Sequence, residues 1–151
     1  MPKLRQIVFE GDPILREKAQ QVLRFNSVLH ELLDDMQLTL KEAKGVGLAA
    51  PQVGVSKRAA IVEIEENLYE LINPVIIKAK GQKNESEGCL SIPGIRGMVP
   101  RAAKLEISAQ DRFGQTFRLK AEDLLARAIQ HEIDHLEGQL FIDIMVEEVE
   151  E

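Results

Sequence analysis

Two histidines four residues apart, His131 and His135, constrain the fold of this chain more than any other feature, because Glu132 completes the pattern His-Glu-x-x-His. On an α-helix this spacing projects both imidazoles from one face, one turn apart, so both rings can reach a single metal ion. The glutamate beside the first histidine then lies within range of a water molecule bound to that ion. The pattern predicts a helix here and metal-assisted hydrolysis as the reaction type.

The apolar residues around this pattern also indicate a helix. From residue 122 to 136 they recur at helical spacing, and Gly138 follows as a C-terminal stop. The same spacing predicts an earlier helix that begins at a cap, Asn26 or Ser27, and runs to about Lys41. On this evidence alone, a solvated helix face with incidental histidines is the alternative to a metal site.

The segments between the two helices are strand-like. We predict strands over residues 59–64, 68–73, 75–80, 104–109 and 115–119, with turns at 65–67 and 111–114, an interruption at Pro74, and a short helical turn at 14–16 after Asp12-Pro13. The order of elements predicts an α+β fold in a single domain over residues 1–151. Mostly antiparallel sheets would pack around the helix that carries the histidines.

The composition narrows the classes of partner. The chain has 151 residues, 44% of them hydrophobic, which suffices for one domain with a core, and its net charge of −6 argues against nucleic acid or an anionic membrane as the main partner. A local basic patch remains compatible with that sum. No run approaches the roughly 20 apolar residues of a membrane span, and residues 1–11 show no secretory signal. We therefore expect a cytoplasmic protein.

A catalytic site of this kind needs a third protein ligand and an open position for water. Cys89, His30 and a carboxylate are the possible third ligands, and Cys89 is the only cysteine in the chain. Glycines and a proline surround Cys89 between residues 87 and 94, which is typical of a shaped turn rather than a core strand. Cys89 as a nucleophile or as a small buried residue are the competing interpretations.

The segment from Gly45 to Gly54 is rich in glycine and alanine. Its glycine spacing does not fit a phosphate loop, and a flexible connection between helix and strand is the simplest interpretation. Small residues there would nevertheless allow tight packing beneath a cleft. Gln52 offers a side-chain amide that could donate to an oxyanion.

Taken together, three segments resemble the peptide deformylase family. The family's motifs have the forms G-x-G-L-A-A-x-Q, E-G-C-L-S and Q-H-E-x-D-H, and here they stand complete and in family order at residues 45–52, 87–91 and 130–135. The resemblance extends outside the motifs and covers roughly the whole chain. It includes residues 12–16, 99–101 and 140–143.

The resemblance implies a role for each matching residue. Cys89, His131 and His135 would bind one divalent metal, natively Fe(II), with Zn(II), Ni(II) or Co(II) as substitutes. Glu132 would carry a proton from water to the leaving amine, and the Gln52 side chain and the Leu90 backbone N–H would hold the oxyanion. The implied reaction removes formyl from the N-terminal formyl-methionine of newly synthesised polypeptides and releases formate.

The resemblance also suggests substrate contacts. The backbone of Gly45, Val46 and Gly47 would pair with the extended peptide, and Val46, Leu124 and Ala128 would line a methionine pocket. Arg96 would contact substrate carbonyls or remain a solvated loop residue. Glu87 is expected at the substrate site, with an ion pair to Arg101 that shapes it, whereas Gln130 and Glu137 are expected to be structural. An N-formyl substrate implies bacteria, a bacterial virus or a bacterium-derived organelle as the setting.

One departure and three rivals bear on these expectations. Some family members dock on the ribosome through a long basic C-terminal helix, whereas this chain ends in the short acidic run 147–151, so docking through that element is in doubt. The rival functions are a zinc peptidase, a metal-sensing module without catalysis, and a degenerate member that binds formylated N-termini without cutting them. Replacement of Glu132 separates these possibilities, because only an enzyme should lose turnover while keeping its metal.

Overall fold

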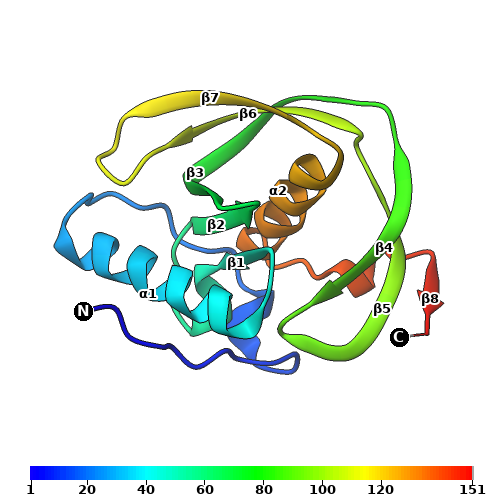
Figure 1. The fold of residues 1–151 in the computed structure, drawn as a ribbon, viewed down its shortest axis with the longest axis horizontal. Helices are drawn as coiled ribbons and strands as arrows, with labels where there is room; N and C mark the ends of the chain where they lie inside the picture. Colours follow the sequence, from blue (N-terminus) through cyan, green and yellow to red (C-terminus); the bar gives the residue numbers. More distant parts are fainter. Residues whose placement is uncertain (151) are drawn as a thin grey trace.

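Strand β2 (Ala59–Ile64) is covered on both faces, and this sets the layering of the molecule, for which a computed structural model describes residues 1–150 (Figure 1). Successive side chains of a strand point to opposite faces. Ile61 accordingly packs with helix α1 (Ser27–Ala43), whereas Val62 packs with helix α2 (Asp123–Leu136). The two helices therefore cover opposite faces of the same sheet.

That sheet has five antiparallel strands in the order β1-β2-β3-β6-β7. Figure 1 shows β6, β7 and part of β3 arching over α2, which lies near the centre of the molecule. Aliphatic side chains from these strands and from α2 form one continuous core cluster. The remaining strands of this sheet are β1 (Gly47–Ala49), β3 (Asn67–Lys80), β6 (Lys104–Gln110) and β7 (Thr116–Glu122).

A second, smaller sheet lies on the other side of α2 (Figure 1). It is antiparallel, in the order β4-β5-β8, with β4 at Lys83–Cys89, β5 at Ile92–Arg101 and β8 at Glu147–Val149. Its apolar residues belong to a separate core cluster with Leu15 and Phe141. Short 3-10 turns η1 (Pro13–Arg16), η2 (Ala50–Val53) and η3 (Phe141–Asp143) complete the fold.

Helix α1 begins and ends where local chemistry requires. The Asn26 side chain accepts a hydrogen bond from the backbone N–H of Leu29, and Lys44 ends the helix in the left-handed conformation, with φ of 57°. The N-terminal segment runs along this helix, where Asp35 accepts bonds from the Lys3 backbone N–H and the Arg5 side chain. Within residues 1–150, no helix is both long and apolar enough to cross a membrane.

The predicted α+β fold, with antiparallel sheets around the motif helix, is confirmed. Both long helices and strand β2 lie where the periodicity predicts them. The predicted interruption at Pro74 is wrong, because β3 continues from residue 67 to 80. A register shift between Ile72 and Val75, with Asn73 at φ of 51°, accommodates the proline in a bulge. Strands β1, β4, β5 and β8 were not predicted, and residues 47–53 form β1 and the turn η2 rather than a flexible connection.

Candidate metal centre and cleft

Three side chains that could bind a metal meet at the junction of α2 and the smaller sheet. Cys89 ends strand β4, while His131 and His135 lie one turn apart on α2. One ligand atom from each of the three residues lies within 4.8 Å of the other two, and the Cys89 Sγ is 3.3 Å from His135 Nε2. One thiolate and two imidazoles form a donor set that fits a divalent transition metal.

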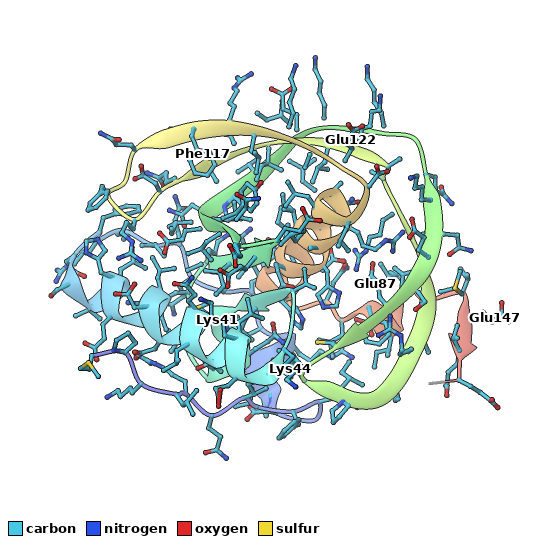
Figure 2. All side chains as sticks on the ribbon, in the orientation of Figure 1. Lys41, Lys44, Glu87, Phe117, Glu122 and Glu147 are labelled. Atoms are coloured by element: carbon cyan, nitrogen blue, oxygen red, sulfur yellow. The ribbon has the colours of Figure 1, made fainter. Side chains whose placement is uncertain are left out.

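The orientation of His131 is fixed by a carboxylate. His131 Nδ1 lies 2.9 Å from Glu87 Oε1, so its Nε2 is left to face Cys89. Figure 2 shows Glu87 between α2 and the smaller sheet. Burial alone would raise the pKa of Glu87, but the hydrogen bonds with His131 and Arg101 outweigh burial and lower that pKa to about 2. Glu87 is therefore an anion at neutral pH.

The two histidines have different electrostatic surroundings. Burial favours the neutral ring of His131, but the nearby Cys89 sulfur and the bond with Glu87 raise its pKa to about 10. Burial and the positive His131 lower the pKa of His135 well below its usual value. A metal ligand must be deprotonated, so His131 would bind a metal ion only as the neutral ring.

Glu132 is held out of solvent beside the cluster. It is 3% exposed, and its Oε1 has no hydrogen-bond partner within residues 1–150. The other carboxylate oxygen of Glu132, Oε2, lies against Gly47 of strand β1, where an added Cβ would clash with it. Burial raises the pKa of Glu132 to about 7. A carboxyl group of that pKa can both accept and donate a proton near neutral pH.

The Gln52 amide has a defined orientation. Its Oε1 accepts the backbone N–H of Ala49 at 2.9 Å, so the NH₂ group faces the cleft. Nε2 lies 3.1 Å from Ser91 Oγ and 3.5 Å from Cys89 Sγ. The short turn η2 thus aims a buried amide donor at the region between Cys89 and Glu132.

These groups surround a cleft of about 380 Å³. Twelve of the thirteen residues predicted at the site line it, and His135 lies behind Cys89. The cleft-lining residues from the prediction are Gly45, Val46, Gly47, Gln52, Glu87, Cys89, Leu90, Arg96, Leu124, Ala128, His131 and Glu132.

Several predicted side chains are engaged in contacts within the protein. The predicted ion pair of Glu87 with Arg101 is present, at 2.8 Å and 3.0 Å. Arg96 donates to Ser86 Oγ, at 2.8 Å from Nη2, and so ties the two strands of the hairpin together. Gln130 bonds the backbone of Ala102. His30 lies on α1, bonded to a backbone carbonyl, and is not part of the cluster.

Several residues at the site were missed from the sequence, among them two that bond its polar side chains. Ser91 accepts from Gln52, and Arg127 lines the cleft and donates to Glu87. A signal for Arg127 was present, since it precedes His131 by one helical turn and so shares its face. Its partners lie more than 25 residues away in sequence, however, and only the fold identifies them.

This arrangement fits a metal-dependent hydrolase: a His-Glu-x-x-His helix, a cysteine on a neighbouring strand that could be the third ligand, and an amide donor, all at one cleft. The comparisons with known proteins narrow this class to one family. A family model described as polypeptide deformylase matches residues 4–151.

Individual relatives agree with that match. Peptide deformylase of Heliobacterium modesticaldum is 54% identical over 138 residues, 91% of this chain and 91% of the relative. Peptide deformylase of Caldicellulosiruptor bescii is 53% identical over 148 residues, 98% of this chain and 89% of the relative. The crystal structure of a peptide deformylase from Legionella pneumophila has a TM-score of 0.92 at 43% identity, over 94% of this chain and 86% of that one.

The chain belongs to the polypeptide deformylase family. It is a hydrolase that removes the N-formyl group from newly synthesised polypeptides, and the family uses a catalytic metal.

Proposed function

We propose that Cys89, His131 and His135 hold the catalytic metal and that Glu132 moves the protons of the reaction. The observation that supports this most directly is the buried Glu132 Oε1, which has no partner within residues 1–150, beside three converging ligand atoms. A purely structural carboxylate would be paired at that depth. In a metal-sensing module without catalysis, neither the Glu132 carboxylate nor the Gln52 amide would have a function.

The metal would act as a Lewis acid that lowers the pKa of a water molecule toward neutrality. We propose Fe(II) as the native ion, with Zn(II), Ni(II) or Co(II) as substitutes, since a mixed sulfur and nitrogen donor set suits all four. If iron is native, activity should decay in air and persist in protein loaded with nickel. Equal stability of all metal forms in air would contradict the proposal of iron.

Glu132 is placed to accept a proton from the attacking water and to pass it to the leaving amine. Its pKa of about 7 supports both halves of that transfer at neutral pH. The Gln52 Nε2 group and the Leu90 backbone N–H are proposed to donate to the oxyanion that develops on the formyl oxygen. Support comes from Gln52, whose side-chain oxygen accepts the Ala49 backbone N–H and so fixes the amide, and from Leu90, which lines the cleft.

The substrate is proposed to add to the sheet as an extended strand. β1 is the terminal strand of the five-stranded sheet, so one of its edges is available to a peptide through residues 45–47. Val46, Leu124 and Ala128 would enclose the methionine side chain. We propose that Glu87 acts by orienting His131 rather than by direct contact with substrate, because its carboxylate is 6% exposed and already accepts several hydrogen bonds.

The proposed partner is a formyl-methionyl nascent peptide in the bacterial cytoplasm. We assign no ribosome-docking role to the acidic C-terminal end, since three of its residues pair with β5 as strand β8 and acidic residues repel RNA. No direct nucleic-acid or membrane contact is proposed.

The first test is the release of formate from a formyl-Met tripeptide. The protein is prepared without oxygen and loaded with Fe(II) or Ni(II), and the acetyl-Met tripeptide serves as the control. We expect rapid release from the formyl peptide only, with loss of turnover and retention of metal in Glu132→Gln. Normal turnover in the Glu132→Gln variant would contradict the proposed role of Glu132 in proton transfer. Cleavage of internal amide bonds would favour the peptidase alternative.

A further inference from the structure

The proposed metal ligands come from two parts of the fold that do not share a hydrophobic core. Helix α2, with both histidines, packs its apolar face into the cluster of the five-stranded sheet. Cys89 belongs to the β4–β5 hairpin, whose apolar residues pack with Leu15 and Phe141 in a different cluster. Figure 1 shows the hairpin as a curved pair of strands beside α2. The position of the sulfur relative to the imidazoles therefore depends on what joins the hairpin to the helix.

Besides the stacking of His131 on Phe141, polar side chains make this joint, and Arg127 supplies the bonds from α2 to the backbone of the hairpin strands. Its Nη1 donates to the Val99 carbonyl of β5 at 2.8 Å, and its Nη2 donates to the Lys83 carbonyl of β4 at 2.9 Å. The same Nη1 lies 2.6 Å from Glu87 Oε2. One side chain from α2 thus contacts both strands of the hairpin and the carboxylate that orients His131.

The contacts at position 127 favour arginine over other residues. Arg127 is 7% exposed, so its charge needs partners, and Glu87 supplies the opposite charge. The planar guanidinium directs several N–H groups at fixed angles, which suits two carbonyls and a carboxylate at once. A lysine would keep the charge but could not hold all three acceptors. From the other side, Arg101 of β5 reaches Glu87 and Asp134 of α2.

We propose that Arg127 is a positioning residue that holds the β4–β5 hairpin against α2 and thereby sets the place of Cys89 relative to His131 and His135. Its effect on the metal rests on the proposed metal site, but its effect on the hairpin does not. Arg127 itself touches neither the metal ligands nor the formyl group in this role. Its loss should loosen the hairpin locally, speed the release of metal, and leave the core of the five-stranded sheet unchanged.

The test compares Arg127→Met and Arg127→Lys with the wild-type protein. Arg118→Met is the matched control, because Arg118 lies exposed on β7, with Glu106 as its 3.6 Å partner. Two quantities are measured: the rate at which nickel-loaded protein releases Ni(II) to excess chelator, and amide hydrogen exchange in the metal-free protein. Residues of β4 and β5 report on the hairpin, and residues of β2 report on the core.

In Arg127→Met we expect nickel release about 10- to 100-fold faster, which is typical when a residue that supports a metal ligand is lost. Exchange should rise at least tenfold in β4 and β5 and stay unchanged in β2. Arg127→Lys should show the same pattern to a smaller degree, and Arg118→Met should match wild type. If Arg127→Met does not fold, Arg127→Lys decides the question.

Unchanged hydrogen exchange in β4 and β5 would overturn the proposal, because Arg127 would then not hold the hairpin against α2. An equal rise of exchange in β2 would also overturn it, because that indicates general destabilisation of the protein. The two measurements also separate this inference from the metal site. If Cys89→Ala kept nickel as tightly as wild type, the proposed metal ligands would be wrong, while hydrogen exchange would still test Arg127.

Discussion

Gly47 of strand β1 lies directly against the Glu132 carboxylate, so that a methyl group on Gly47 would overlap Oε2. The neighbouring small residues Ala49 and Ala60 lie on the same face of the sheet and are fully buried under α2. The helix can therefore lie close to the strand. The absence of a side chain at Gly47 gives the carboxylate its place at the bottom of the cleft.

We predict that Gly47→Ala lowers kcat by about 100-fold, because a displacement of roughly 1 Å in a catalytic group can cost that much. The three atoms nearest to an added Cβ at Gly47 all belong to Glu132 and none to a proposed metal ligand, so metal content should stay at the wild-type level. Formate release and metal analysis on the same preparation check both statements. A variant with wild-type kcat would show that Glu132 tolerates displacement, and a variant without metal would show that the substitution disturbs more than Glu132.

Gln52→Glu tests the amide donor cleanly. A glutamate keeps an oxygen for the Ala49 N–H but loses the NH₂ group that faces the cleft. We expect kcat to fall about 100- to 1000-fold with little change in KM, as for loss of one oxyanion donor. Ser91→Ala is the control, because it removes only a partner of Nε2 and should change kcat far less. Equal losses in both variants would contradict the assignment.

Metal binding should stabilise the folded protein through Cys89. At Ni(II) concentrations 100-fold above Kd, linkage gives about 2.7 kcal/mol. For a domain of this size that corresponds to a rise in Tm of about 5–10 °C. Thermal unfolding with and without nickel measures the rise, and a chelator should abolish both the rise and the deformylase activity. Cys89→Ala should lose most of the rise, and a full rise in that variant would exclude the thiolate as a ligand.

Asp35 should make stability depend on pH in acid. Burial opposes its charge, but the Lys3 backbone N–H and Arg5 lower its pKa below the usual value in the folded protein. A carboxylate with a lowered folded pKa stabilises the protein above its unfolded pKa, about 3.9, and loses that contribution as pH falls through the folded value. The difference in unfolding free energy between wild type and Asp35→Asn should therefore be constant above about pH 5 and shrink below it.

Urea unfolding at pH 7 and pH 3 measures this difference. Glu31→Gln is the control, because Glu31 is exposed on the same helix. It should change the unfolding free energy little at either pH. A difference for Asp35→Asn that stays constant down to pH 3 would contradict the assigned direction of the pKa shift.

The fold was predictable wherever the local pattern and the final packing agree. Helix α2 buries one continuous apolar stripe, so its periodicity identifies its bounds almost to the residue. Strand β4 has the sequence KNESEGC, which is polar at most positions, so no alternation of polar and apolar residues marks it. β5 contains Pro93 and two glycines, which are residues that locally disfavour strands. Pairing between these two segments, rather than their individual preference, makes them strands.

Residue chemistry alone singles out His131, Glu132, His135 and Cys89 as candidates, whereas Leu90 and the substrate contacts were predicted only from the family resemblance. Few residue types bind metals, so Cys89 stood out as the only cysteine even though its strand did not. Arg127 did not stand out, because a charged residue on a helix usually faces water. Its burial depends on Lys83 and Val99, which only the folded chain brings to it. The catalytic and substrate-binding roles stay predictions for the experiments above.

Cys89 is the only thiol in the chain, it is partly exposed, and it lines the cleft. A thiol-specific label such as a fluorescent maleimide can therefore attach at one place only, without any engineered cysteine. If Cys89 binds the metal as proposed, its metal-bound thiolate would resist alkylation, and the fraction of molecules that label slowly would be the fraction that carry metal. The protein thus contains its own reporter, which would allow metal loading to be followed in purified protein without a substrate.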